Sequence, residues 1–262
     1  MDPMTDIPAM NNPVTEFYDS LSADYDLMTG FEKRFIQERP FFRMFVDKYQ
    51  IASALDAGCG TGFHSLLLAQ MGVAVTAVDI SQKMLEKVNE HARELSLSVT
   101  TLRADFQELS AAMGAQVDAV FSLGNSLAHL HTSGELLAAL RNFNAVLKPN
   151  GMLFLQTLNY DRIMEAKEKI QNTKEIGSKT FVRSYDYTND GIVFHIKATD
   201  RSSAVEREKD ISVPLRPLKS KELVDVLAKA GFADVRLYGG VSLQEFHPEE
   251  SKDLVVLARK PE

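Results

Sequence analysis

The feature that most constrains the fold of this chain is a turn with three glycines, Asp56-Ala57-Gly58-Cys59-Gly60-Thr61-Gly62. The turn begins within a short apolar run, residues 54–59. It leads into residues 61–72, which predict a helix with Gly72 just past its end. Glycine allows positive φ and lets a ligand approach the backbone without a Cβ clash. The following helix offers free N–H groups and the positive end of its dipole. A plain strand-to-helix turn needs only one glycine, so the pattern favours a ligand-binding turn.

A carboxylate follows at the distance that a nucleoside site requires. Residues 73–81 predict a buried strand that contains Asp79, about 20 residues after Gly58. In a doubly wound sheet this strand lies beside the first, so Asp79 can accept hydrogen bonds from both hydroxyls of a ribose. Ser81 can cap the next helix, residues 82–95, which leaves Asp79 available to a ligand.

Strands and helices continue to alternate along the chain. A helix from about Ser133 carries one apolar stripe, and a turn at 148–151 ends it. Ser220 can cap a helix at 221–230 that Gly231 closes. This alternation predicts an α/β fold, with a doubly wound, mostly parallel sheet of seven strands. The stripe consists of Leu136, Leu140, Phe143 and Leu147, and the further strands are expected at 97–105, 117–123, 152–159, 234–240 and 253–260.

Two parts of the chain depart from this alternation. Asn189-Asp190-Gly191 is a hairpin signal between two β-rich runs, with a third strand at about 204–213, and predicts an antiparallel insertion at about 178–215. Residues 14–50 predict two or three helices, the second interrupted near Pro40. We therefore expect an N-terminal arm and helical lid at 1–50, and a ligand-binding domain at 51–262.

Composition narrows the class of protein. The 262 residues carry 29 basic and 36 acidic side chains, and the net charge of -7 argues against nucleic acid as a partner. The single cysteine excludes an internal disulfide, and the six histidines lack metal-ligand spacing. The first residues lack the apolar core of a signal peptide, and no apolar run is long enough for a membrane span. We expect a cytoplasmic protein that binds neither metal nor membrane.

Two nucleoside cofactors fit the glycine turn. The dinucleotide fingerprint G-x-G-x-x-G requires glycine where Phe63 stands, which disfavours a nicotinamide-dependent oxidoreductase but keeps it as the alternative. The pattern G-x-G-x-G after Asp-Ala resembles the class I S-adenosylmethionine (SAM)-dependent methyltransferases. That resemblance implies a Rossmann-like fold, SAM as cofactor, S-adenosylhomocysteine as product and a small-molecule methyl acceptor.

Two further segments resemble the glycine and sarcosine N-methyltransferases: 122–130 (SLGNSLAHL) and 159–163 (NYDRI). This resemblance implies transfer to nitrogen, with an oxygen or carbon acceptor as the alternative. It places Asn125 against the acceptor and His129 along the cofactor, with His129 also a candidate proton acceptor. Tyr25, on the expected lid, can bind substrate or contact the sulfonium through its ring. The turn and the resemblance together predict these cofactor-binding residues: Arg34, Asp56, Gly58, Gly60, Asp79, Met84, Asp105, Phe106 and Leu123.

One position departs from that family. Its arginine before Asn-Tyr-Asp, which pairs with the carboxylate of glycine, is replaced by Leu158. Leucine cannot form a two-pronged contact with a carboxylate, so glycine itself is disfavoured. Arg183 or Arg201 on the insertion could take this role, and a less acidic or more apolar acceptor fits better.

Overall fold

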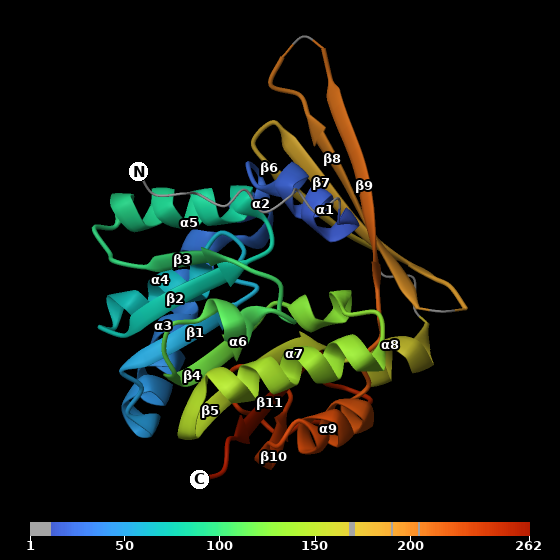
Figure 1. Ribbon diagram of the computed structural model, residues 1–262. Helices are drawn as coiled ribbons and strands as arrows, with labels where there is room; N and C mark the ends of the chain where they lie inside the picture. Colours follow the sequence, from blue (N-terminus) through green and yellow to red (C-terminus); the bar gives the residue numbers. More distant parts are fainter. Residues whose placement is uncertain (1–11, 168–170, 190, 204) are drawn as a thin grey trace.

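The computed structural model describes residues 12–262, apart from 168–170, 190, 204 and the side chain of Glu32. The expected arm at the N-terminus therefore lies mostly outside the described residues. The described chain forms two sheets, a large one with helices on both faces and a smaller one that rises from it (Figure 1). Within these residues, no helix is both long enough and apolar enough to cross a bilayer.

The main sheet has seven strands in the order β10-β11-β5-β4-β1-β2-β3. The five strands from β5 to β3 are parallel, whereas β11 is antiparallel to both β5 and β10. This arrangement confirms the predicted α/β fold. The strands are β1 (Ser53–Ala57), β2 (Ala74–Asp79), β3 (Thr100–Arg103), β4 (Val117–Ser122), β5 (Leu147–Leu158), β10 (Ala233–Tyr238) and β11 (Asp253–Arg259).

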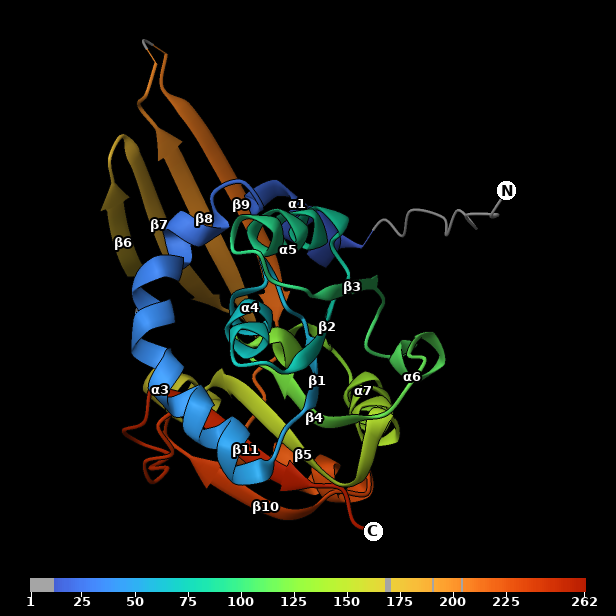
Figure 2. The same cartoon turned by 90° about the vertical axis from the view of Figure 1, so that its left-hand side faces the viewer.

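Helices cover both faces of the main sheet. α3 (Phe31–Tyr49), α4 (Phe63–Gln70) and α5 (Gln82–Glu94) pack on one face, and α7 (Ser133–Val146) and α9 (Ser220–Lys229) on the other. Figure 2 shows α3 and α7 on opposite sides of the strands. The short helices α6 (Leu109–Ala112), η1 (Ser126–His129) and α8 (Tyr160–Ala166) lie in the connections.

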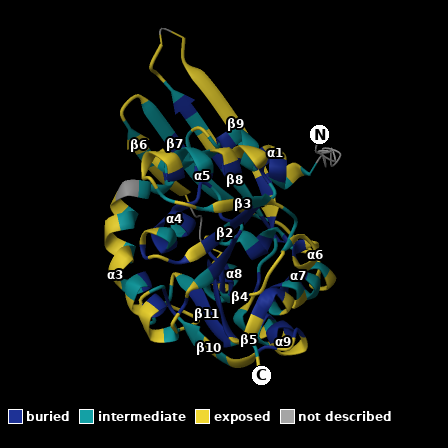
Figure 3. Ribbon diagram, turned by 60° about the vertical axis from the view of Figure 1, so that its left-hand side comes forward, coloured by how far each residue is buried: buried dark blue, intermediate teal, exposed yellow. Residues whose placement is uncertain are grey.

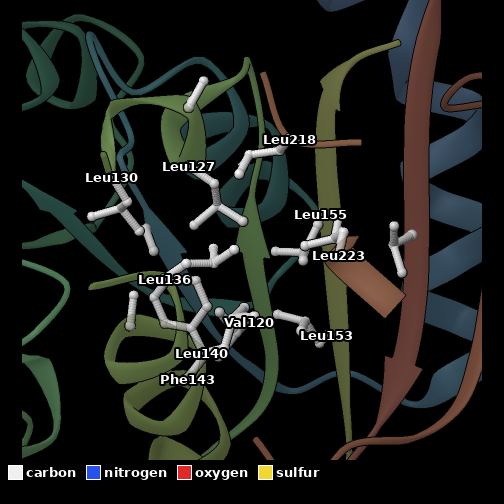
Figure 4. Packing of buried hydrophobic residues seen from close by; sticks show 14 of the residues in the cluster. Val120, Leu127, Leu130, Leu136, Leu140, Phe143, Leu153, Leu155, Leu218 and Leu223 are labelled. Atoms are coloured by element: carbon white, nitrogen blue, oxygen red, sulfur yellow. The ribbon is translucent and has the colours of Figure 1, made fainter. Parts of the chain in front are cut away.

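The apolar stripe on α7 forms much of one core. Leu136, Leu140 and Phe143 are fully buried against strand residues such as Val120 and Leu153 (Figure 4). The predicted turn at 148–151 is instead part of β5, which begins at Leu147. Asn150 adopts a φ of 63° within this strand, so a residue that usually marks a turn is accommodated there.

Pro40 does not interrupt its helix, contrary to the sequence prediction. α3 is continuous from Phe31 to Tyr49 and contains Pro40. A proline removes one helical hydrogen bond, but Phe42 and Phe45 just after it are fully buried against the main sheet. This packing holds the helix together, and it makes α3 part of the core although it falls within the expected lid region.

The insertion is a four-stranded antiparallel sheet in the order β6-β7-β8-β9. Its strands are β6 (Gln171–Ile176), β7 (Lys179–Tyr187), β8 (Ile192–Asp200) and β9 (Arg207–Leu215). The antiparallel pairing of β7 with β8, with Tyr187 opposite Ile192, confirms the predicted hairpin, and Thr188 N donates to Gly191 O, while Asp190 lies outside the described residues. β6 was not predicted, because its largely polar and exposed sequence has no apolar face. Figure 3 shows the far part of β9 as exposed, whereas β8 beside it is mostly of intermediate burial.

Two short helices precede α3: α1 (Pro13–Leu21) and α2 (Tyr25–Thr29). They lie beside the insertion (Figures 1 and 2) and are bound to it by lysines. Lys174 Nζ donates to the carbonyls of Leu27 and Met28 at the C-terminal end of α2, and Lys179 pairs with Asp24. We call α1 and α2 together the lid.

The cap of α9 also differs from the prediction. Lys219 is the N-cap residue, and Ser220 is the first residue of the helix. The backbone N–H of Ser220, which has no partner within the helix, donates to Asp161 Oδ2 at 3.0 Å. A carboxylate from α8 therefore provides the capping interaction that Ser220 was expected to make.

Candidate active site

The glycine turn follows β1 and forms the floor of a cavity. Gly58 has a φ of 75°, and a Cβ on it would lie 2.6 Å from Ser126 Oγ and 3.1 Å from the Phe106 ring. Its N–H donates to Val78 O at 2.8 Å, which ties the turn to β2. Only glycine fits between these neighbours, so the turn stays open to a ligand.

Asp79 ends β2 beside this turn. Its Oδ2 accepts from Gly60 N and its Oδ1 from Ser81 N, both at 2.9 Å. Burial raises the pKa of Asp79 to about 6, and these backbone hydrogen bonds oppose the rise. Each carboxylate oxygen still has a lone pair for a hydroxyl donor, so the geometry suits a ribose. Ser81 caps α5 as predicted, by accepting from Met84 N at 3.1 Å.

The cavity above the turn, which we call the turn cavity, brings together most of the predicted site residues. Its wall combines the turn with the lid, the ends of β2 and β4, and the segment after β3. The predicted residues that line it are Tyr25, Arg34, Gly58, Gly60, Asp79, Asp105, Phe106, Leu123 and His129.

Asp56 and Met84 lie behind the wall instead of in it. Asp56 is almost fully buried and accepts from Ser65 Oγ at 2.6 Å, and burial raises its pKa. Met84 is fully buried near the start of α5. Neither side chain lines the cavity, and their direct contact with a ligand remains a prediction.

Gly62 explains the spacing of the glycines. It has a φ of 90°, and a Cβ on it would lie 2.9 Å from Val88 on α5. Phe63, at the position where the dinucleotide fingerprint has glycine, packs against Phe31 and Phe35 of α3, and the Arg34 guanidinium lies 4.3 Å from its ring centre. The third glycine therefore makes room for α5, and the next residue anchors α3.

A second cavity, which we call the insertion cavity, adjoins the first. Tyr18, Tyr25, Thr29, Arg34, Gly124 and His129 line both. The rest of its wall comes from the lid, the ends of β4 and β5, the start of β11 and one face of the insertion. These residues are mostly apolar, including Phe17, Leu21, Met28, Leu158 and Phe194. Two adjacent cavities with a shared wall can hold two reactants in contact.

Asn125 lines only the insertion cavity, and its amide is already engaged. Its Nδ2 donates to Tyr160 Oη at 2.8 Å, and its Oδ1 accepts from Leu158 N at 3.1 Å. Its φ of 77° places the backbone in the left-handed region. The side chain thus connects the ends of β4 and β5 at the wall of the insertion cavity, and its expected contact with the acceptor stays a prediction.

His129 lies between the two cavities. Burial, together with the charge of His131, lowers the pKa of His129 to about 4, so the imidazole is neutral at neutral pH. Its Nε2 lies 2.8 Å from Tyr18 Oη, while its buried Nδ1 has no partner among the described residues. Burial raises the pKa of Tyr18 well above its usual value, so the phenol keeps its proton.

Sequence reasoning missed several residues of this site. Ser126 closes over Gly58, Asp253 begins β11, and Phe194 projects from the insertion. Ser126 could have been found, because it belongs to the segment 122–130 that was singled out. Asp253 carries no local signal, since it reaches the cavity only through the pairing of β11 with β5.

Comparison with known proteins gives consistent results. A family model described as "Methyltransferase domain" matches residues 54–151. The chain is 28% identical over 246 residues to the glycine/sarcosine N-methyltransferase of Aphanothece halophytica, which covers 94% of this chain and 89% of that protein. It is 33% identical over 159 residues to the glycine/sarcosine N-methyltransferase of Parasynechococcus marenigrum, covering 61% of this chain and 56% of that protein. The crystal structure of an S-adenosylmethionine-dependent methyltransferase from Clostridium acetobutylicum superposes with a TM-score of 0.81 over 94% of this chain and 99% of that one, at 16% identity.

Proposed function

We propose that the chain, which is a SAM-dependent methyltransferase with a Rossmann-like fold, transfers a methyl group to a nitrogen atom of a small molecule. The observation that carries this proposal is the junction of the two cavities at Tyr18, Tyr25, Gly124 and His129. The turn cavity would hold the cofactor, and the insertion cavity would hold the acceptor. The lid contributes to both walls.

The turn cavity offers a group for each part of the cofactor. Asp79 would accept from the ribose hydroxyls, and Asp105 with Phe106 would contact the adenine. Gly58 and Gly60 provide a floor without side chains beneath the methionine part. Arg34, whose Nε donates to Glu38 Oε1 at 2.8 Å, would direct its terminal nitrogens toward the cofactor carboxylate.

The chain's own contribution to the reaction is alignment and exclusion of water. SAM, when bound, supplies a methyl group on a positively charged sulfur. Holding two reactants in line is worth about 7–11 kcal/mol in well-oriented systems. Tyr18 and Tyr25 bury the junction, and the neutral His129 puts no second positive charge beside the sulfonium.

A nitrogen atom is favoured as the methyl acceptor over oxygen or carbon because the site offers only a weak proton acceptor. An amine reacts as its neutral form and needs no strong base, whereas a hydroxyl or carbon acceptor does. With a pKa of about 4, His129 is a weak base. The two relatives described above carry names that specify N-methyl transfer, which supports the same atom here.

Labelled SAM offered with matched amines, alcohols and phenols tests this function. We expect labelled product with amines only, accompanied by S-adenosylhomocysteine. Gly58→Ala should abolish transfer, because its Cβ would collide with Ser126. Gly114→Ala is the matched control, since a Cβ there meets no atom within 4 Å. Transfer to alcohols or phenols but not to amines would contradict the proposal.

A further inference from the structure

We propose that the acceptor carries a carboxylate as well as an apolar body, and that Arg183 of the insertion binds this carboxylate. The inference rests on the proposed function, since it assigns a substrate class to the insertion cavity. It differs from binding of glycine in two respects: the position of the cation and the presence of apolar walls.

Arg183 lies on the face of the insertion that closes the cavity. In the register of β7 and β8, Arg183 is opposite Ile196 and Tyr185 is opposite Phe194. Opposite residues on paired strands share a face, and all four line the insertion cavity. Tyr185 and Phe194 stack at 5.1 Å and form an apolar floor next to the guanidinium.

The other charged groups that line this cavity have partners. Arg34 pairs with Glu38. Burial raises the pKa of Asp253, while a hydrogen bond from Gln156 and the charges of Lys252 and Arg34 oppose this rise. Asp253 therefore has a hydrogen-bond donor in Gln156 and cations in Lys252 and Arg34 nearby, although burial outweighs them.

Arg183, in contrast, makes no hydrogen bond or ion pair within the described part of the chain. It is partly buried, and its positive charge acts on the neighbouring phenols of Tyr25 and Tyr185. A partly desolvated cation without a partner is costly, and an anionic ligand relieves that cost. The planar fork of a guanidinium matches a carboxylate with two parallel hydrogen bonds.

The walls around Arg183 set the size and polarity of the rest of the ligand. Leu158 occupies the end of β5, where the resembling family has its arginine, and it lines the same cavity. Phe17, Leu21 and Met28 of the lid segment add apolar surface. A carboxylate held from the insertion, with apolar side chains around it, suits an amino acid that is larger and more apolar than glycine.

Matched substrates test the inference by activity. We expect kcat/KM for leucine to exceed that for leucinamide and for glycine. Arg183→Met should lower kcat/KM for leucine about 100-fold, mostly through KM, and change that for leucinamide little. Arg183→Lys should recover part of the loss. Arg207→Met changes an exposed residue on the same insertion and should alter kcat/KM for neither leucine nor leucinamide.

A binding measurement separates this inference from methyl transfer itself. The protein saturated with S-adenosylhomocysteine is titrated calorimetrically with 4-methylpentanoate and with 4-methylpentanamide, neither of which has an amine. We expect only the carboxylate to bind, and only when Arg183 is present. If leucinamide is methylated as well as leucine, or if both probes bind alike, the inference fails while N-methyl transfer stands. If the carboxylate binds through Arg183 but no amine is methylated, the proposed function fails and the anion site stands.

Discussion

The phenol oxygen of Tyr18 and the Nε2 atom of His129 lie 2.8 Å apart, and this contact joins the lid to the segment after β4. The two rings meet edge to face, with their centres 5.4 Å apart. The phenol keeps its proton and the imidazole is neutral, so this contact is a hydrogen bond between two uncharged groups, and the imidazole tautomer sets which of them donates. The lid is therefore connected to the wall that both cavities share.

The first prediction follows from the neutral state of His129. The pKa of His129 is lowered to about 4, so between pH 6.5 and 4 the unfolded chain takes up a proton there that the folded chain does not. Stability should fall as the pH falls through this window. His129→Gln should remove up to about 3 kcal/mol of this pH dependence in urea unfolding. His247→Gln, an exposed change, should leave the dependence as it is; an identical loss in both variants would contradict the assignment.

A second prediction concerns Asp79. Ribose hydroxyls donate to the ionised carboxylate, so the affinity for S-adenosylhomocysteine should fall as the pH falls below about 6. Asp79→Asn should weaken binding at pH 8 about 10- to 100-fold and remove the pH dependence. Calorimetry measures both effects, with the exposed Asp234→Asn as control. Unchanged affinity in Asp79→Asn would refute the ribose contact.

A third prediction concerns the bonds between the lid and the glycine turn. Asp26 accepts from Thr61 Oγ1 at 2.6 Å and pairs with His91 Nε2 at 3.1 Å. The hydrogen bond to Asp26 raises the pKa of His91. This stabilisation is complete below the unfolded pKa of His91 and is lost as the pH rises through its raised folded pKa.

Asp26→Asn should therefore cost about 1 kcal/mol more at pH 6 than at pH 9, a modest value because the pair is partly exposed. Thermal unfolding at the two pH values measures the cost. Hydrogen exchange over residues 13–29 should become faster in the variant at pH 6. Equal costs at both pH values would show that the ion pair does not hold the lid.

The fourth prediction concerns Asn125. Replacing it with alanine leaves Tyr160 Oη and Leu158 N without their partner, which should cost about 1–3 kcal/mol of stability. Because Asn125 lines the insertion cavity alone, turnover should fall more than the affinity for SAM. Tyr160→Phe, which removes one of these two bonds, should have the smaller effect. A loss confined to SAM binding would place Asn125 in the other cavity.

The main elements of the fold are predictable because their signals are local. Buried parallel strands are read from apolar runs such as 73–81, and α7 from its stripe. The exceptions are cases where tertiary contacts override a local rule. Pro40 remains inside a helix because Phe42 and Phe45 anchor it, and β6 is a polar edge strand held by its pairing with β7.

The residues of the candidate site also divide into those with a local sequence signal and those that depend on tertiary contacts. The glycine turn and Asp79 are predictable because a nucleoside site uses consecutive residues and the end of the next strand. From the sequence alone, Arg183 and Arg201 are two equal candidates for binding a carboxylate of the acceptor. The structure distinguishes them, because Arg183 faces the insertion cavity whereas Arg201 pairs with Glu206 on the exposed part of the insertion. Asp253 depends on the pairing of β11 with β5, which no short motif encodes.

The position of α1 and α2 over both cavities has a kinetic consequence. Lysines from β6, β7 and β9 hold these helices from one side, and Ser81, Thr61 and His91 hold them from the other. One outward movement of the lid would expose both compartments together, so the two reactants would share a single entrance. The turnover number should then be limited by how often that entrance opens, and solvent viscosity should slow the enzyme more than a heavier isotope in the transferred methyl group does.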